Sequence, residues 1–131
     1  MMANESALEG ARILIVEDDE LSSMLAEEML AELGCTVAGK ARSVEAAAAA
    51  IEHNGAFDCV MLDVRLGPEI SSEIAGELIK KSLPFIICSG YDIRLPGMNI
   101  PVVDKPYSIE TLGSALRTAM SKANGDCRVR A

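Results

Sequence analysis

The stretch CVMLDVRLGPEI at residues 59–70 decides how the chain folds and where its chemistry lies. Its first half is an unbroken apolar run, which is typical of a strand buried on both faces. The run ends in a bare aspartate, Asp63, which is followed by Gly67 and Pro68 in a short loop. A carboxylate at the rim of an apolar core costs free energy unless a partner compensates its charge. The rest of the sequence must supply that partner, or Asp63 is only a turn residue.

This stretch contains one of five short apolar runs that have the length and composition of strands. The runs lie at residues 12–16, 36–41, 58–62, 84–88 and 101–104. The second run alternates weakly and contains Gly39, which suits a strand at the edge of a sheet. Strands that alternate with helices form a parallel sheet covered on both faces. With right-handed crossovers, the best fit is an α/β, flavodoxin-like, doubly wound sheet of five parallel strands in the order 2-1-3-4-5.

Apolar residues at helical spacing predict helices between these runs. In the first helix they are Leu21, Met24, Leu25, Met29 and Leu33. In the third helix they are Ile70, Ile74, Leu78 and Ile79. Gly34 ends the first helix, and Ser43 and Ser108 are placed to cap the second and the last. The interval from Tyr91 to Pro101 holds two prolines and a glycine, so the fourth helix is short or absent.

Length and charge restrict the classes of protein to which the chain can belong. Its 131 residues fit one domain, assigned to residues 11–123, between an N-terminal leader at 1–10 and a C-terminal tail at 124–131. The formal net charge of −8 argues against partners such as nucleic acids and anionic membranes. The apolar runs are too short to span a membrane, and the first residues lack the pattern of a signal peptide. Cys59 and Cys88 lie inside apolar runs and fit small buried hydrophobes better than metal ligands or disulfide partners, so we expect a protein of the reducing cytoplasm.

Polar side chains stand directly after four of the five predicted strands. Glu17 and Asp18 follow the first, Asp63 the third, Ser89 the fourth and Lys105 the fifth. Because such sheets bind ligands beyond the carboxyl ends of their strands, we expect these side chains at one edge. Crowded carboxylates raise one another's pKa, and a divalent cation with oxygen ligands, Mg²⁺, removes that conflict. Carboxylates, Mg²⁺, a lysine and a hydroxyl favour a phosphoryl group, for which Asp63 is the natural acceptor.

Four segments in the same order, ILIVEDDE, VMLDV, CSGY and VVDKPY, resemble the receiver domain of two-component response regulators. The resemblance covers about residues 11–123 and implies a signalling phospho-acceptor, not an enzyme. It implies that Asp63 accepts a phosphoryl group from a histidine kinase or a histidine phosphotransfer protein. His53 is the only histidine and has no acidic or cysteine partner beside it, so we expect the phosphohistidine to belong to another protein.

The same resemblance implies a role for each residue around Asp63. Asp18 and Asp63 ligate Mg²⁺, Glu17 acts through a water molecule, and the backbone carbonyl of Arg65 is a further ligand. The receiver fold takes up about 120 residues, so we expect no attached output domain. The output is then a phosphorylation-dependent contact with an unknown protein, or onward phosphotransfer to another histidine.

The activation switch departs from the common receiver pattern. The resemblance implies that Ser89 turns toward the phosphoryl group on activation and that Lys105 pairs with it. Val102 stands three residues before Lys105, where many receivers carry an aromatic switch residue. Tyr91 is the available substitute. The segment LPFIICSGYD and the reduced fourth helix resemble the FAT GUY subfamily, which implies a stand-alone or stress-signalling receiver with an altered output face.

Two other functions are compatible with an aspartate after a buried strand. A phosphatase resembling the haloacid dehalogenases would use Asp63 as its nucleophile, but it needs a second aspartate two residues on, where this chain has Arg65. A flavin-binding module on the same fold would need a Ser/Thr/Gly-rich phosphate loop after the first strand. The acidic EDDE at residues 17–20 would repel that phosphate. The phospho-accepting receiver is therefore the preferred hypothesis.

Overall fold

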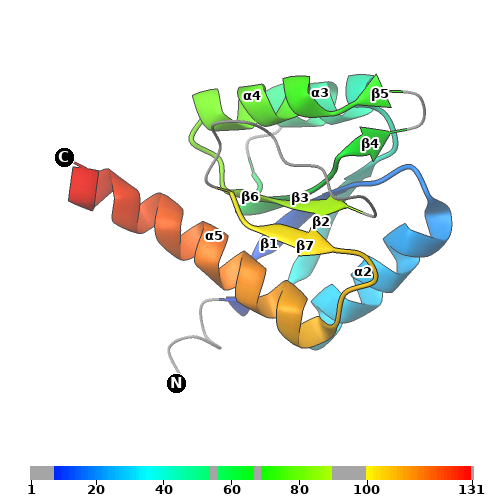
Figure 1. The fold of residues 1–131 in the computed structure, drawn as a ribbon, viewed down its shortest axis with the longest axis horizontal. Helices are drawn as coiled ribbons and strands as arrows, with labels where there is room; N and C mark the ends of the chain where they lie inside the picture. The colour runs from blue at the N-terminus through cyan, green and yellow to red at the C-terminus, as the bar shows by residue number, and fades with distance from the viewer. Residues whose placement is uncertain (1–7, 54–55, 67–68, 90–99, 131) are drawn as a thin grey trace.

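A five-stranded parallel sheet forms the centre of the computed structural model, which describes residues 8–53, 56–66, 69–89 and 100–130. Its strands are β1 (Arg12–Val16), β2 (Thr36–Ala41), β3 (Cys59–Asp63), β6 (Phe85–Ser89) and β7 (Val102–Asp104). They lie in the order β2-β1-β3-β6-β7 (Figure 1), as predicted for a flavodoxin-like sheet. The bounds of β3 and β6 are one residue later than predicted, so Asp63 and Ser89 are the last residues of their strands.

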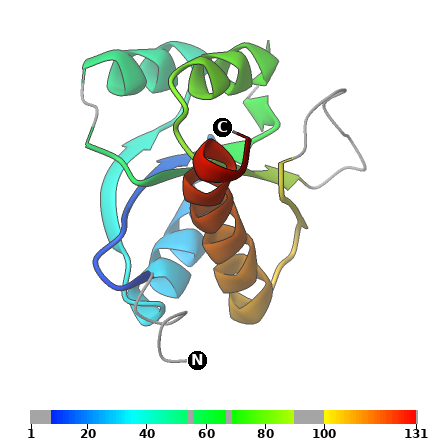
Figure 2. The same cartoon turned by 90° about the vertical axis from the view of Figure 1, so that its left-hand side faces the viewer.

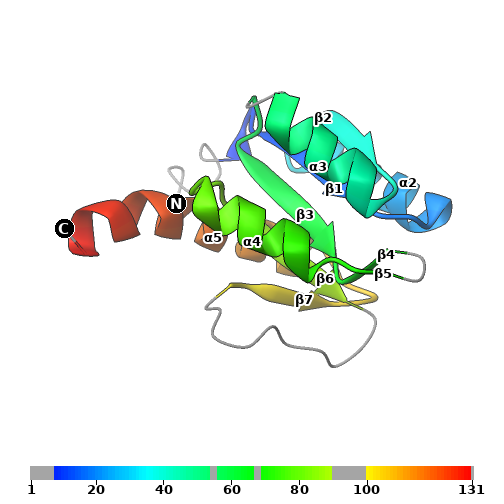
Figure 3. The same ribbon diagram turned by 90° about the horizontal axis from the view of Figure 1, so that it is seen from above.

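Two of the described helices cover each face of the sheet. Helices α2 (Glu20–Glu32) and α5 (Ile109–Arg130) lie on one face, and α3 (Val44–His53) and α4 (Ser72–Lys80) on the other (Figures 1 and 2). Seen from above, α3 and α4 run side by side over the sheet (Figure 3). Successive strand residues point to opposite faces, so the apolar side chains form one core cluster under each pair of helices.

Helix α2 buries only part of the apolar face that its spacing predicts, because Met29 and Leu33 pack against the core but the large apolar residues of its first turns do not. Its buried residues are Ser23, Ala26 and Leu30. The exposed fractions of Leu21, Met24 and Leu25 are 65%, 49% and 50%. The spacing therefore predicts the helix correctly, but these three side chains lie in solvent. Two of the three residues that α2 buries, Ser23 and Ala26, are small.

A short antiparallel hairpin follows β3, and the sequence patterns do not predict it. Strand β4 (Arg65–Leu66) pairs with β5 (Glu69–Ile70), with Arg65 opposite Ile70. The prediction that Ile70 belongs to the third helix is therefore wrong, because α4 begins at Ser72. The hairpin leaves the sheet at the carboxyl end of β3 and returns the chain to Ser71, directly before α4.

Some residues of the predicted leader and tail belong to described parts of the fold. Leu8, in the predicted leader, is 1% exposed and packs in the core cluster beneath α2 and α5. The backbone N–H of Gly10 donates to the carbonyl of Gly34 at 2.8 Å, which ties the leader to the end of α2. Helix α5 continues to Arg130, so the predicted tail is helical up to that residue.

The predicted caps are confirmed at two helices. The backbone N–H of Ala46 donates to Oγ of Ser43 at 3.0 Å, and that of Thr111 donates to Oγ of Ser108 at 3.1 Å. The predicted shortening or absence of a helix between β6 and β7 concerns residues 90–99, which lie outside the described residues. In the part of the chain that the structure describes, no helix has the length and apolar character needed to cross a membrane.

Candidate functional site

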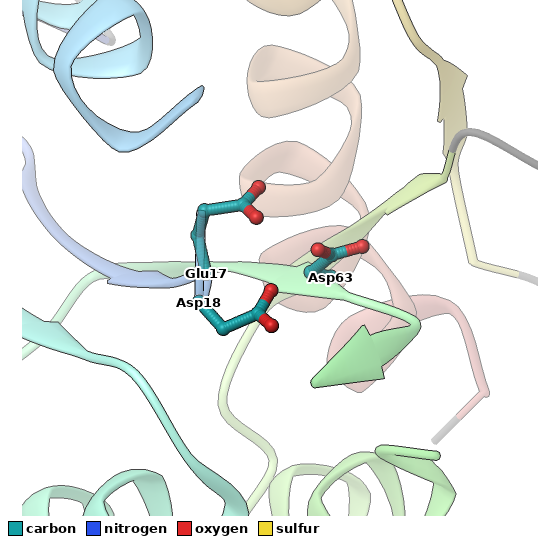
Figure 4. A group of neighbouring side chains, drawn as sticks. All are labelled: Glu17, Asp18 and Asp63. Carbon is teal, nitrogen blue, oxygen red and sulfur yellow. The ribbon is translucent and has the colours of Figure 1, made fainter. Parts of the chain in front are cut away.

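Three carboxylates meet at the carboxyl ends of β1 and β3 (Figure 4). Glu17 and Asp18 directly follow β1, Asp63 ends β3, and the two strands are neighbours in the sheet. One oxygen of each carboxylate lies within 4.8 Å of an oxygen of each of the other two. Glu17 and Asp63 are buried, and Asp18 is half-buried. The sheet therefore produces the predicted crowding of carboxylates.

Lys105 brings a positive charge to this cluster from the end of β7. Its Nζ lies 2.6 Å from Oε1 of Glu17 and 3.4 Å from Oδ2 of Asp63. The other carboxylate oxygen of Glu17, Oε2, accepts the backbone N–H of Asp19 at 3.1 Å. Because β6 lies between β3 and β7, the lysine side chain reaches across the end of β6 to the carboxylates. Glu17 therefore orients the lysine that contacts Asp63.

The surroundings of Asp63 favour its neutral form. Burial is the largest cause that raises the pKa of Asp63 to about 7, followed by hydrogen bonding to Glu17 and its negative charge, while Lys105 opposes the change. For Lys105, burial alone would lower the pKa, but the hydrogen bond to Glu17 and the charges of Asp63 and Glu17 raise it above the ordinary value. The lysine is thus charged at neutral pH, while Asp63 of the metal-free protein is only partly ionised.

We expect the metal-free protein to lose stability relative to its Asp63→Asn variant as the pH rises from about 4 to about 7. In this range the folded state keeps the proton on Asp63 and the unfolded chain releases it, so rising pH favours the unfolded state. Lys105 does not change the sign, because its raised pKa keeps its contribution throughout the range. The relative loss should be on the order of 2 kcal/mol, measured by urea unfolding with a chelator present. Parallel pH profiles of the two proteins would contradict it.

Ser89 lies at the same edge of the sheet as the carboxylates. Asp63 pairs with Cys88, directly before Ser89, and Ser89 pairs with Asp104, directly before Lys105. Ser89 is 1% exposed, and its carbonyl accepts the backbone N–H of Lys105 at 2.7 Å. The end of β6 thus holds both the serine and the backbone of the lysine in place beside Asp63.

Arg65 and Tyr91 are the two remaining residues that the sequence assigns to the site. Arg65 opens the hairpin after β3, two residues beyond Asp63, and its side chain is exposed. That its backbone carbonyl binds the metal stays a prediction. Tyr91, the proposed switch residue, lies outside the described residues.

Sequence spacing does not reveal two contacts of the site. Tyr107 lines a small cavity of about 10 Å³ together with Glu17 and Asp63, and burial raises the pKa of its hydroxyl. Its place two residues after Lys105 was the available signal, but an aromatic residue there is compatible with simple packing. The hydroxyl of Ser71 donates to the backbone carbonyl of Asp63 at 2.6 Å. No side-chain pattern can indicate this bond, because every residue carries such a carbonyl.

At the amino end of β3, in contrast to its carboxyl end, a single carboxylate is paired with its own cation. Asp58, directly before the strand, accepts hydrogen bonds from the backbone N–H of Arg12 at 2.8 Å and from its guanidinium at 3.3 Å. The hydrogen bond from the Arg12 side chain is the main cause that lowers the pKa of Asp58. One end of β3 therefore carries a carboxylate paired with a cation, and the other carries carboxylates that share one lysine.

The chain is similar to proteins of known families along most of its length. Residues 13–94 match the model of the family described as response regulator receiver domain. Over 121 residues the chain is 30% identical to the sensor kinase CckA of Brucella abortus, a stretch that makes up 86% of the chain and 13% of that kinase. The chain thus spans only a small part of the length of this relative.

Solved structures show the same architecture. The solution structure of SdrG from Sphingomonas melonis Fr1 matches with a TM-score of 0.75 and 32% identity, over 85% of the chain and 97% of SdrG. The receiver domain of the response regulator PhyR from Erythrobacter litoralis matches with a TM-score of 0.69 and 25% identity, over 91% of the chain and 93% of that domain.

Proposed function

The chain belongs to the response regulator receiver domain family, and from this premise we propose that Asp63 accepts a phosphoryl group from a phosphohistidine of another protein. The observation that carries the proposal is the contact between Lys105 and Asp63 within a cluster of three carboxylates at one edge of the sheet. A nucleophilic carboxylate, a fixed cation and a candidate metal site are the groups that phosphoryl transfer requires. The chain then acts as a module of two-component signalling.

The donor set of the cluster fits Mg²⁺. Ligand oxygens on opposite sides of a Mg²⁺ ion are about 4 Å apart, and the carboxylate oxygens of Glu17, Asp18 and Asp63 already lie within 4.8 Å of one another. We infer that Asp18 and Asp63 bind the ion directly, with the carbonyl of Arg65. Glu17 would act through a water molecule, which agrees with the partners that Lys105 and Asp19 already give its two oxygens. When bound, Mg²⁺ supplies positive charge that offsets the carboxylates and the phosphoryl oxygens.

The transfer step follows from the positions of Asp63 and Lys105. An ionised Oδ of Asp63 attacks the phosphorus of the phosphohistidine, so that the new P–O bond forms as the P–N bond breaks. The imidazole nitrogen of the donor keeps the electron pair of the broken bond. Lys105 favours the ionised form of Asp63 before the step and pairs with a phosphoryl oxygen after it. We infer that Ser89, at the end of β6, offers its hydroxyl to another oxygen.

A signalling role fits these residues better than turnover of a small substrate. An aspartyl-nucleophile phosphatase needs a second carboxylate two residues after the nucleophile, and this position holds Arg65, whose side chain is exposed. The receiver family match also does not favour the phosphatase. The output is then a contact that depends on phosphorylation of Asp63, or onward transfer to another histidine. Any turnover is limited to formation and hydrolysis of the aspartyl phosphate.

The exposed apolar residues of α2 support a donor of protein nature. Leu21, Met24 and Leu25 begin two residues after Asp19 and are about half exposed or more. Large apolar side chains that gather on a soluble surface are typical of a protein contact. A donor protein bound to this part of α2 would lie beside the carboxylate edge, because α2 begins at Glu20, two residues after Asp18.

The test of the proposal uses two phosphodonors of different size. With Mg²⁺, the chain should gain one phosphoryl group both from acetyl phosphate and from a phosphorylated histidine phosphotransfer protein of its own organism, and none with a chelator. Leu25→Asp should slow transfer from the protein at least about tenfold, because a charge replaces an apolar contact, and leave acetyl phosphate unaffected. Intact-mass spectrometry over time measures both reactions.

Ile79→Asp is the matched control for this test. Ile79 is 49% exposed, like Leu25 at 50%, but it lies on α4 on the other face of the sheet. It should keep transfer from both donors. Wild-type protein that gains nothing from either donor overturns the proposed function, and equal rates for the Leu25 and Ile79 variants overturn the docking surface alone.

A further inference from the structure

Ser71 is buried and donates a hydrogen bond to the backbone of the proposed acceptor. The residue is 1% exposed and lies between the hairpin strand β5 and the start of α4. Its Oγ donates to the carbonyl of Asp63 at 2.6 Å, and its backbone N–H donates to the carbonyl of Val64 at 2.8 Å. One serine thus holds two consecutive carbonyls, at the acceptor and at the residue that follows it.

The position of Ser71 would ordinarily give its hydroxyl another task. Ser71 directly precedes α4, where a serine side chain normally accepts a hydrogen bond from the first turn of the helix. It makes no such bond, and its backbone angles of φ −89° and ψ 21° are not the extended ones of a capping residue. Ser43 and Ser108 occupy the same position before α3 and α5, and both cap their helices. At α4 the hydroxyl serves Asp63 in place of the helix.

The two bonds from Ser71 fix the peptide that leaves the acceptor. They join the end of β3 to the start of α4 and close the intervening hairpin into a loop held at both ends. The backbone that carries the Asp63 side chain therefore cannot rotate without breaking a buried hydrogen bond. Arg65, whose carbonyl we infer to bind the metal, lies within the same closed loop.

We propose that Ser71 is a positioning residue for phosphoryl transfer at Asp63, an inference that rests on the proposed function. Transfer requires the attacking oxygen to lie in line with the bond that breaks, and small misplacements slow such reactions strongly. The Ser71 hydroxyl supplies this alignment through the backbone, without touching the phosphoryl group. Removing the hydroxyl leaves the carboxylates of Asp18 and Asp63 and the carbonyl of Arg65 in the chain, so saturating Mg²⁺ can still fill the site.

The experiment compares Ser71→Ala with Ser71→Thr and with Ser43→Ala. At saturating acetyl phosphate and Mg²⁺, Ser71→Ala should lower the maximal rate of phosphorylation about tenfold. Ser71→Thr keeps the hydroxyl and should recover most of the rate. Ser43→Ala removes a cap of α3 that follows β2, a strand separated from β3 by β1, so it controls for a simple loss of stability and should keep the wild-type rate.

The results of this experiment separate failure of the positioning role of Ser71 from failure of the proposed function. Wild-type phosphorylation together with an unchanged maximal rate in Ser71→Ala overturns the positioning role and leaves the proposed function standing. Slowing in Ser43→Ala equal to that in Ser71→Ala, or failure of Ser71→Thr to recover the rate, also overturns it. If Ser71→Ala does not fold, Ser71→Cys preserves the volume, donates only a weak hydrogen bond, and should show the same slowing. Absence of phosphorylation in the wild type instead overturns the proposed function itself.

Discussion

Asp63→Asn should abolish phosphorylation of the chain, with a rate at least about 10³-fold below that of the wild type. The amide of asparagine occupies the volume of the carboxylate at the end of β3 but has no nucleophilic oxygen. It also weakens the metal site, because Asp63 contributes one of the three carboxylates of the cluster. Intact-mass spectrometry with acetyl phosphate and Mg²⁺ should then detect no phosphoryl group on the variant.

Asp58→Asn is the matched control for this loss. It alters the aspartate that directly precedes the same strand. Asp58 is paired with Arg12 and is not one of the three carboxylates of the cluster. This variant should be phosphorylated at the wild-type rate. A phosphoryl group on the Asp63 variant, mapped by borohydride reduction and peptide sequencing to another residue, would show that the acceptor has been assigned wrongly.

Lys105→Ala should lower the rate of phosphorylation by about 10² to 10³ and destabilise the metal-free protein. The lysine is the cation that contacts both Glu17 and Asp63, so its removal leaves two buried carboxylates without their shared partner. Breaking a buried pair in this way typically costs about 3–5 kcal/mol, and we expect the lower value because 22% of the lysine side chain is exposed. Single-turnover phosphorylation and urea unfolding measure the two effects.

Lys40→Ala separates this effect from the loss of an ordinary ion pair. Lys40 also pairs with a glutamate, Glu27, at 3.2 Å, but both side chains are more than a third exposed and lie on β2 and α2 away from Asp63. Surface pairs contribute little to stability, so this variant should be close to the wild type in both measurements. Equal behaviour of the two lysine variants would remove the case for Lys105.

The centre of the sheet could be predicted from the sequence because β1, β3 and β6 are buried on both faces. Such strands appear as unbroken apolar runs, and their bounds came within one residue at β3 and β6. The buried face of α2 could not be predicted in the same way. Apolar spacing marks a helix, but two of the residues that α2 buries, Ser23 and Ala26, are too small or too polar to stand out in such a pattern, whereas Leu25 is half exposed. Strands of two residues, as in β4 and β5, are too short to show a period.

The site was predictable to the extent that topology alone positions it. Residues that follow neighbouring parallel strands must share an edge, which is why Glu17, Asp18, Asp63 and Lys105 come together as predicted. The pairing of Lys105 with Glu17 depends on how far the lysine reaches across β6, and spacing does not determine this distance. The roles assigned to these residues stay predictions, as does the resemblance to the FAT GUY subfamily.

The different charge arrangements at the two ends of β3 imply that stability and activity make opposite demands on the carboxylate cluster. Asp58 is neutralised by Arg12, whereas Asp63 is crowded by Glu17 and Asp18 and shares Lys105 with Glu17. Replacing the Asp63 carboxylate by a neutral side chain relieves this crowding of negative charge, but it also removes the proposed acceptor. A screen of variants for heat resistance alone would therefore enrich inactive proteins. Stabilising changes that preserve signalling should be sought at the Asp58 end of the sheet and on the helices.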